Sequence, residues 1–188
     1  MLLDDRRSLL LLIDPQTRLL GALPPARAEA LMPRWRLLLK AAELLDIPTI
    51  VTRQYPQGLG PLPAALIEAL SPAAVCRDKT TFSCLADPAI AQLLGGGRDQ
   101  VVVAGIETHV CVMQTVFDLT ARAAQPAVVA DACGSRHPES HALATARFAQ
   151  SGVPLVAAES VVFEWLRDAA HPRFRELSAL IRALGPGA

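Results

Sequence analysis

Short, uninterrupted apolar runs alternate with longer segments of helical periodicity along this chain. The two strongest runs are residues 8–13 (SLLLLI) and residues 100–104 (QVVVA), which show no alternation of polar and apolar residues. A strand of this kind must be buried on both faces, as in a parallel sheet covered by helices. Crossover connections in such a sheet are right-handed. The pattern predicts an α/β fold: a three-layer α/β/α sandwich around a doubly wound, Rossmann-like, six-stranded parallel sheet of order 3-2-1-4-5-6.

The expected elements cover most of the chain and leave no repeat or linker between them. The predicted strands are residues 8–13, 48–52, 74–77, 100–104, 126–130 and 154–157. The predicted helices are residues 27–45, 63–70, 88–94, 108–124, 138–151, 160–167 and 172–183. A chain of 188 residues is long enough for one domain with a full core, so we expect a single domain over residues 1–188.

Composition excludes several classes of function. Eighteen basic residues balance eighteen acidic ones and no basic stripe stands out, so we expect no nucleic-acid partner. The early apolar run, residues 9–13, is too short to span a membrane or to serve as a signal peptide. We therefore expect a cytoplasmic protein with no membrane partner. The four cysteines lack CxxC spacing and are expected to be free thiols.

The hydrophobic content is 52%, more than a core alone needs, which suggests a covered partner surface. The last predicted helix carries Phe174, Leu177, Leu180 and Ile181 on one face. We expect a homo-oligomer, a dimer or higher.

Three reactive side chains follow strands that this topology brings together. Ligands of doubly wound sheets bind beyond the carboxyl ends of the strands, where the strand order reverses. With the expected order, the first and fourth strands are neighbours there. Asp14 ends the first strand, Lys79 follows the third, and Cys111 follows the fourth. All three are expected at one edge of the crevice.

Cys111 is the candidate nucleophile. Thr108 is a plausible N-cap, which places Cys111 in the first turn of a helix, where free N–H groups and the helix dipole stabilise an anion. With a lysine ammonium nearby, the pKa of the thiol should be lowered. The same N–H groups could hold an oxyanion. The alternative is that Cys111 is a small buried hydrophobic residue.

Asp14 and Lys79 each have a functional and a structural interpretation. An acid that closes an apolar strand needs a partner, and beside a thiol it can act as general base and then as general acid. The Asp14-Pro15 pair could instead open a turn. Lys79 could favour the charged forms of both acid and thiol, or it could be a surface lysine.

The histidines offer no metal site. His109 lies two residues from Cys111, so on a helix the two side chains do not face each other. His137 and His141 could share a helix face, but no third ligand is evident and we interpret them as a solvated helix start. No metal and no cofactor are expected.

Three segments, LLLIDPQ, DKTTFS and VVVAGIETHVCV, together resemble the isochorismatase-like cysteine hydrolase superfamily over roughly residues 8–183. RQYPQGLG, DACGSR and HPRFRELSALI are most similar to its isochorismatase domain-containing subgroup. The resemblance implies one isochorismatase-like hydrolase domain and a catalytic triad of Asp14, Lys79 and Cys111. It also implies a cis peptide between Ile106 and Glu107 that turns N–H groups into the crevice, so the oxyanion site is expected at Ile106, Glu107 and Val110.

The sequence departs from some members of this superfamily. Its nicotinamidases hold a metal through an acid and histidines after the second strand, whereas VTRQYPQGLGP has neither, so nicotinamidase activity is not expected. Leu19 stands where an aromatic residue is common. The substrate pocket is expected to be lined by five residues that could equally pack or cap: Gln16, Gln54, Tyr55, Phe82 and Thr108.

These observations predict a hydrolase of a small-molecule substrate, acting on an amide C–N bond through a thioester on Cys111. Asp14 would transfer the proton and Lys79 would hold both anions. One alternative is a catalytically silent protein that uses the fold for binding or assembly. The other is a redox-sensing thiol protein, with Cys84 or Cys133 as the resolving cysteine if either lies in the same crevice.

Overall fold

A computed structural model describes residues 1–185 of the chain and contains one six-stranded sheet, all of whose strands are parallel. The strand order is β3-β2-β1-β4-β5-β6, which confirms the predicted topology. The strands are β1 (Ser8–Ile13), β2 (Thr49–Gln54), β3 (Val75–Lys79), β4 (Gln100–Ile106), β5 (Gln125–Gly134) and β6 (Leu155–Val156).

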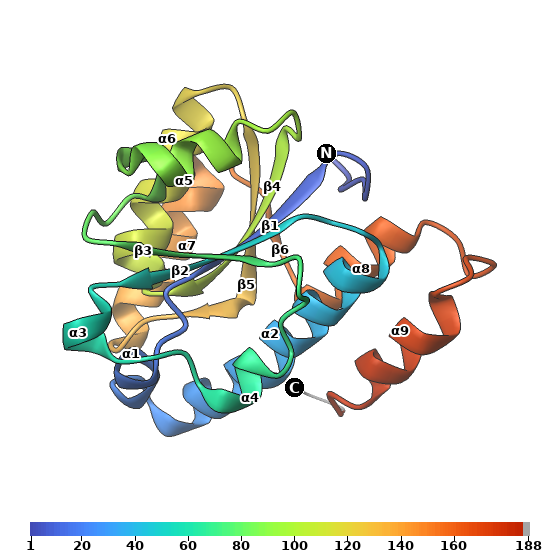
Figure 1. Ribbon diagram of the computed structural model, residues 1–188, viewed down its shortest axis with the longest axis horizontal. Coiled ribbons are helices and arrows are strands. Elements are labelled where there is room, and N and C mark those ends of the chain that lie inside the picture. The colour runs from blue at the N-terminus through green and yellow to red at the C-terminus, as the bar shows by residue number, and fades with distance from the viewer. Residues whose placement is uncertain (186–188) are drawn as a thin grey trace.

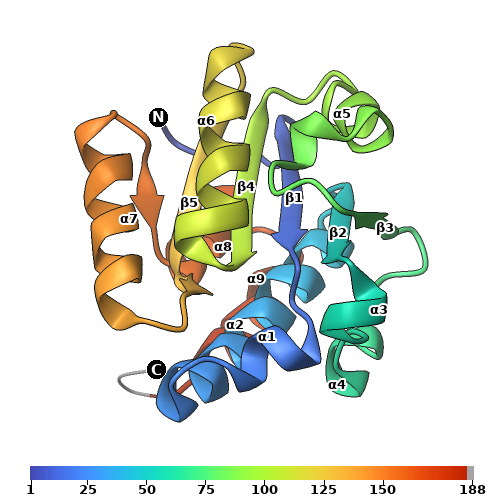
Figure 2. The same cartoon turned by 90° about the vertical axis from the view of Figure 1, so that its left-hand side faces the viewer.

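Helices cover both faces of the sheet. Figure 2 shows α5 (Pro88–Leu94), α6 (Met113–Ala121) and α7 (Pro138–Gln150) on the near face. The long α2 (Pro25–Leu44) and α8 (Ala158–Leu166) cover the other face, and α9 (Phe174–Arg182) packs outside these two (Figure 1). Shorter pieces complete the chain: α1 (Thr17–Gly21), α3 (Pro56–Leu59), α4 (Ala64–Ile67), the 3₁₀-helix Cys84–Ala86 and the π-helix Thr108–Val112. Within residues 1–185 no helix is long and apolar enough to cross a membrane.

Strand β1 divides its side chains between two hydrophobic cores. Leu10 and Leu12 belong to the core under α2, α8 and α9. Leu9, Leu11 and Ile13 point to the opposite face, into the core under α5, α6 and α7. Because successive side chains of a strand alternate between faces, a strand between two helical layers must be apolar at every position. This is the physical reason for the uninterrupted run in the sequence.

The structure extends or divides several predicted elements. The short helices α1 and α3 were not predicted, because four or five residues are too few to show a helical period. The predicted helix over residues 108–124 begins instead as a separate π-helical turn. Strand β5 continues past its predicted end because Asp131, polar within a strand, is satisfied by Arg34 Nε at 3.0 Å and by the N–H of Ala158 at 2.9 Å.

The apolar face of α9 is used within the chain itself. Leu177 and Ile181 are buried in the core with α2, and Leu180 packs against the same core. The Phe174 ring lies 6.4 Å from that of Phe163 on α8. The interpretation of this face as a partner surface is therefore wrong, because a terminal amphipathic helix can bury its apolar face on the body of its own chain as readily as on a second copy.

Gly105 lets β4 approach β1 at the end where the reactive side chains gather. It pairs with Ile13 and has a φ of +128°. A Cβ at this position would lie 2.0 Å from the carbonyl oxygen of Ile13 and 2.7 Å from its nitrogen. Both neighbours are backbone atoms of a buried strand, which cannot move aside without breaking the sheet.

We expect Gly105→Ala to lower the free energy of unfolding by more than about 4 kcal/mol, because the methyl group meets backbone and the residue must keep a positive φ. Gly152→Ala is the matched control: its φ is +75°, but no atom lies within 4 Å of the added Cβ. It should cost only about 1–2 kcal/mol. Urea unfolding of both variants measures the difference, and equal losses would contradict this account.

Candidate active site

A buried ion pair joins the ends of β1 and β3. Lys79 Nζ lies 2.6 Å from Asp14 Oδ2, and both side chains are fully buried. Asp14 directly follows β1, with a φ of +51°, and Lys79 is the last residue of β3. Strand β2 lies between these two strands, so the long lysine side chain reaches past the end of β2 to the aspartate. The topology thus brings together two of the three residues that the sequence predicted to meet.

Polar groups around this ion pair satisfy its remaining hydrogen-bonding capacity. Lys79 Nζ also donates to Gln54 Oε1 at 2.7 Å and to the carbonyls of Thr81 and Phe82 at 3.2 and 3.3 Å. Thr52 Oγ1 donates to Asp14 Oδ1 at 2.7 Å. Burial is the largest single influence and lowers the pKa of Lys79, but the Asp14 charge, the two nearby thiols and the hydrogen bond to Asp14 together outweigh it, so the net shift is upward. The lysine therefore remains an ammonium ion.

Thr52 is a site residue that sequence reasoning missed. Its hydroxyl fixes one carboxylate oxygen of Asp14, and its carbonyl accepts the Asp14 N–H at 3.1 Å. A polar residue within the β2 run was the available signal. It was not used because threonine is common in strands, so its side chain alone did not separate a structural role from a functional one.

Cys111 lies in the π-helical turn that follows β4 and is only 6% exposed. The N–H of Val112 donates to the carbonyl of Glu107 at 3.2 Å, an i→i+5 bond that defines the wider turn. The cap position belongs to Glu107, and no side chain caps the turn. The expectation that Thr108 is the N-cap is therefore wrong, because Thr108 is already the first residue of the turn and the extended residue before it is Glu107. The peptide bond between Ile106 and Glu107 is cis, as the resemblance implied.

The Cys111 thiol is protonated in this geometry. Burial is the main cause that raises its pKa, and the negative charge of Asp14 raises it further. Lys79 acts in the opposite direction without compensating. The predicted lowering of the Cys111 pKa is wrong, since it counted the ammonium and the helix start but not the carboxylate beside the thiol. The acid is nevertheless placed where a base for this thiol is needed.

Each polar residue of the segment after β4 is bound to the chain that follows β5. Glu107 Oε1 accepts the N–H of Arg136 at 2.9 Å. His109 Nδ1 lies 2.9 Å from Ser135 Oγ, which agrees with the expectation that His109 does not pair with Cys111.

The remaining two positions of this segment are also engaged. Thr108 Oγ1 lies 2.9 Å from His141 Nδ1 on α7. The N–H of Val110 donates to the carbonyl of Glu107 at 3.1 Å, so it is used within the turn. Sequence reasoning missed Ser135 and Arg136, although the topology places the chain after β5 at the same edge as the chain after β4. His141 is half-buried, so its interpretation as part of a solvated helix start is wrong.

The predicted pocket residues separate into two buried glutamines and two exposed aromatic residues. Gln16 binds the end of β2: its Nε2 donates to the carbonyls of Gln54 and Gly60 at 3.0 and 2.8 Å, and its Oε1 accepts the N–H of Gln54 at 2.7 Å. Gln54 binds Lys79 directly. Tyr55 and Phe82, 54% and 52% exposed, follow Gln54 and Lys79 in the chain and are open to solvent.

The other thiols differ from Cys111 in their surroundings. Burial raises the pKa of Cys84 to about 11, against the opposing effect of Lys79, and raises that of Cys133 to about 12. Cys84 is buried, because the 3₁₀-helix turns it into the core of α5 and α6. Cys76, on the edge strand β3, is the one partly exposed thiol among the described residues.

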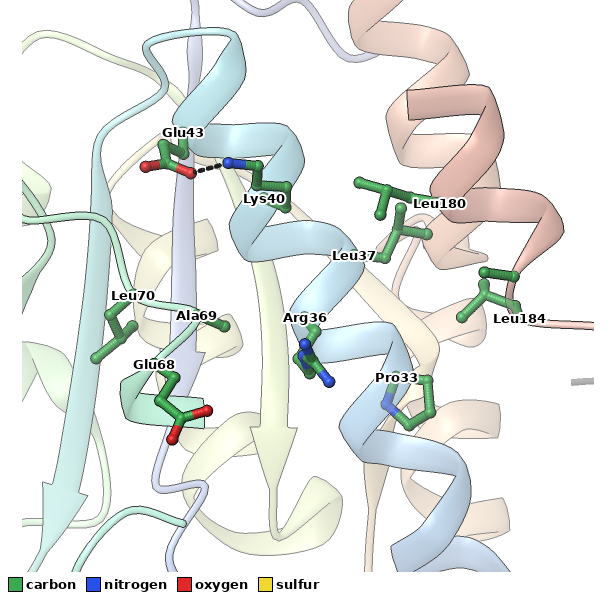
Figure 3. Close-up of a pocket in the computed structure, with 11 residues that line it drawn as sticks. Pro33, Arg36, Leu37, Lys40, Glu43, Glu68, Ala69, Leu70, Leu180 and Leu184 are labelled. Atoms are coloured by element: carbon green, nitrogen blue, oxygen red, sulfur yellow. Dashed lines mark hydrogen bonds and ion pairs between the residues drawn. The ribbon is translucent and has the colours of Figure 1, made fainter. Parts of the chain in front are cut away.

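One surface groove of the described chain lies away from these residues. Figure 3 shows it between α2, the turn after α4 and α9, with Arg36 and Glu68 facing one another and Leu37 and Leu180 on another wall. Its volume is about 570 Å³, and it contains none of the residues of the ion pair or the Cys111 turn. Over residues 1–185, no group of three His, Cys, Asp or Glu side chains is arranged to hold a metal ion.

Comparison with known proteins gives a consistent result. The family model of the isochorismatase domain matches residues 8–160. Isochorismatase domain-containing protein 2A of Mus musculus is 42% identical over 149 residues, which are 77% of this chain and 69% of the mouse protein. Isochorismatase domain-containing protein 2 of Homo sapiens is 42% identical over 153 residues, 79% of this chain and 71% of that protein. The solved MAR1 ribonuclease of Caenorhabditis elegans has a TM-score of 0.90 at 34% identity, covering 96% of this chain and 92% of that one.

The protonated thiol leads to a prediction for alkylation. Because the Cys111 pKa is raised, the rate of its modification by iodoacetamide should keep rising about tenfold per pH unit from pH 7 to beyond pH 9. Asp14→Asn removes a charge that raises this pKa, so at pH 8 it should speed the alkylation by about tenfold. Asp99→Asn, at an exposed carboxylate bound to Arg7, is the matched control and should change nothing. Peptide mapping measures the rates, with Cys76 as internal reference. A wild-type rate that levels off below pH 8 would contradict the assignment.

Proposed function

The chain belongs to the isochorismatase family, and from this premise we propose that it is a hydrolase of small-molecule amides that uses Cys111, Asp14 and Lys79. The single observation that carries the proposal is the buried Asp14–Lys79 pair beside the Cys111 thiol. A carboxylate whose charge acts on the thiol is placed to remove its proton during attack. Three elements of the sheet converge to make this arrangement, which a packing role for Cys111 would not require.

In the proposed reaction Asp14 takes the thiol proton as Cys111 Sγ attacks the carbonyl carbon of the amide. A C–S bond forms, and the carbonyl oxygen becomes an oxyanion. When the tetrahedral intermediate collapses, the C–N bond breaks and Asp14 gives its proton to the leaving amine. Water then attacks the thioester, with Asp14 taking one proton from it. The acid is released and the proton returns to the Cys111 sulfur.

Lys79 supports this cycle by electrostatics. Its ammonium lies 2.6 Å from the Asp14 carboxylate and stabilises the Cys111 thiolate while it forms. A thiol that is protonated at rest and loses its proton only during attack is protected from adventitious oxidation, because the thiolate is the reactive form. The high resting pKa of Cys111 is compatible with turnover because Asp14 removes the proton only as the sulfur attacks.

A small-molecule substrate fits the chain better than a nucleic acid. The C. elegans neighbour is called a ribonuclease, but this chain has no net charge, whereas phosphate backbones are bound by clustered basic residues. The buried site also suits a compact carbonyl group. We expect no metal or cofactor in the reaction, since the proposed chemistry needs neither.

A redox-sensing thiol is the second candidate, because one observation favours it. Cys84 and Cys111 both raise the pKa of Lys79, so the two thiols lie near the same ammonium. Peroxide treatment followed by mass analysis tests this function. A Cys84–Cys111 disulfide with no turnover of any amide would replace the hydrolase proposal.

We also propose a homo-oligomer, now on different grounds from the last helix. Large apolar side chains remain exposed on both sides of the sheet, among them Ile67, Leu143 and Phe163. The side chains of Tyr55 and Phe82, which follow the site residues Gln54 and Lys79, are exposed as well. Such residues are candidates for a covered surface between copies.

A panel of simple amides tests the proposed chemistry. Wild-type protein should hydrolyse at least one member, with activity unchanged by EDTA. Cys111→Ser and Asp14→Asn should each lower kcat by about 10³-fold or more, because the nucleophile or its base is lost. Cys76→Ser, at the edge of the sheet, is the matched control and should retain activity.

Trapping with hydroxylamine should give the hydroxamate of the acyl group through a thioester on Cys111. Full activity in Cys111→Ser would refute the proposed nucleophile.

Light scattering tests the assembly. Across micromolar concentrations the measured mass should be at least twice the 20.0 kDa of one chain. A mass of one chain throughout would refute the oligomer.

A further inference from the structure

Thr108 and Arg27 contact the two ring nitrogens of His141. Nδ1 lies 2.9 Å from Thr108 Oγ1, and Nε2 lies 3.3 Å from Arg27 Nη2. Arg27 comes from α2 and is itself fixed by two carbonyls: its Nε donates to Cys133 at 3.0 Å and one Nη2–H donates to Ala130 at 2.7 Å, which leaves the second Nη2–H for His141. The histidine therefore lies between a held guanidinium and the first residue of the Cys111 turn.

The guanidinium decides which ring nitrogen carries the proton. Arginine has only donors and no acceptor, so an Nε2–H directed at Arg27 would place two donors, one of them cationic, against each other. Nε2 must therefore present its lone pair. A neutral imidazole then carries its hydrogen on Nδ1 and donates it to Thr108 Oγ1.

The surroundings also keep the ring neutral. Burial is the main cause that lowers the pKa of His141, to about 4, and the positive charge of Arg27 lowers it further. Nearby carboxylates do not compensate: Glu107 is bound by Arg136 and Asp131 by Arg34. His109 is bound to Ser135 and is turned to that hydroxyl.

The tautomer of His141 determines the hydrogen-bonding role of the Thr108 hydroxyl. Its oxygen accepts from His141 Nδ1, so its own hydrogen is left for another acceptor, and no protein acceptor contacts Thr108 Oγ1 within the described residues. Thr108 is fully buried, directly follows the cis-peptide residue Glu107, and opens the turn that carries Cys111. A buried hydroxyl whose hydrogen lacks a protein acceptor is a donor available to a ligand.

We propose that Arg27 and His141 are positioning residues that fix the Thr108 hydroxyl as a hydrogen-bond donor to the carbonyl oxygen of the substrate at Cys111. This extends the proposed function and rests on it. As the thiolate adds to the carbonyl carbon, the oxygen gains negative charge and the hydrogen bond from Thr108 strengthens. If His141 instead carried its proton on Nε2, Nδ1 would accept from Thr108 and turn that hydrogen away from the substrate.

Nuclear magnetic resonance of the resting protein tests the tautomer without any turnover. Long-range ¹H–¹⁵N correlation spectra distinguish the two neutral tautomers, and comparison with His141→Asn assigns the ring among the four histidines. We expect Nδ1–H at pH 7 and no protonation down to pH 5. An Nε2–H pattern, or an ordinary titration near pH 6.5, would overturn the proposal. This readout stays valid even if no amide is hydrolysed, so failure of the proposed function is distinguishable.

Kinetics test the second step. Thr108→Val keeps the shape but removes the donor and should lower kcat about 10- to 100-fold with little change in KM, because the bond matters most in the transition state. Thr108→Ser restores the hydroxyl and should recover activity to within about threefold. His141→Asn keeps a donor near the Nδ1 position and should be closer to wild type than His141→Phe. An unchanged kcat in folded Thr108→Val would overturn the assigned role.

Discussion

The buried pair of Asp14 and Lys79 is the interaction on which this site depends. Two unit charges removed from water are stable only if each finds its counter-charge and enough hydrogen bonds, and here Gln54, Thr52 and two carbonyls complete the set. The loss of either partner of such a pair costs about 3–5 kcal/mol, because the other charge is left buried. The ends of β1, β2 and β3 are therefore held in one register by a single electrostatic requirement.

This pair also explains the state of the thiol. Burial is the main cause of the raised Cys111 pKa; within the pair, the negative charge of Asp14 raises it further and outweighs the opposing effect of Lys79. At rest the proton is on the Cys111 sulfur, and Asp14, the proposed base, lies near it. Under the proposed function, the reaction then needs only a short transfer within a group of three side chains, in surroundings where water does not screen their charges.

The fourth and fifth strands supply the other half of the site. Gly105 lets β4 lie close against β1, and the cis peptide and the π-turn follow directly. Glu107, Thr108 and His109 are each held by the segment that runs from the end of β5 into α7. The turn bearing Cys111 is thus fixed from two sides, by the sheet and by side-chain hydrogen bonds, before any ligand arrives.

Local pattern determined the fold and the approximate meeting point of Asp14, Lys79 and Cys111. Apolar runs such as residues 8–13 require burial on both faces, and parallel strands must end at the same edge, so both results follow from the sequence itself. The sequence did not determine the thiol pKa, the role of Thr52, the bonds of His141, or the burial of α9 on its own chain. Each depends on which group lies within a few ångströms across the fold, and electrostatic and packing energies are set by those distances and by the exclusion of water, which only the tertiary structure decides.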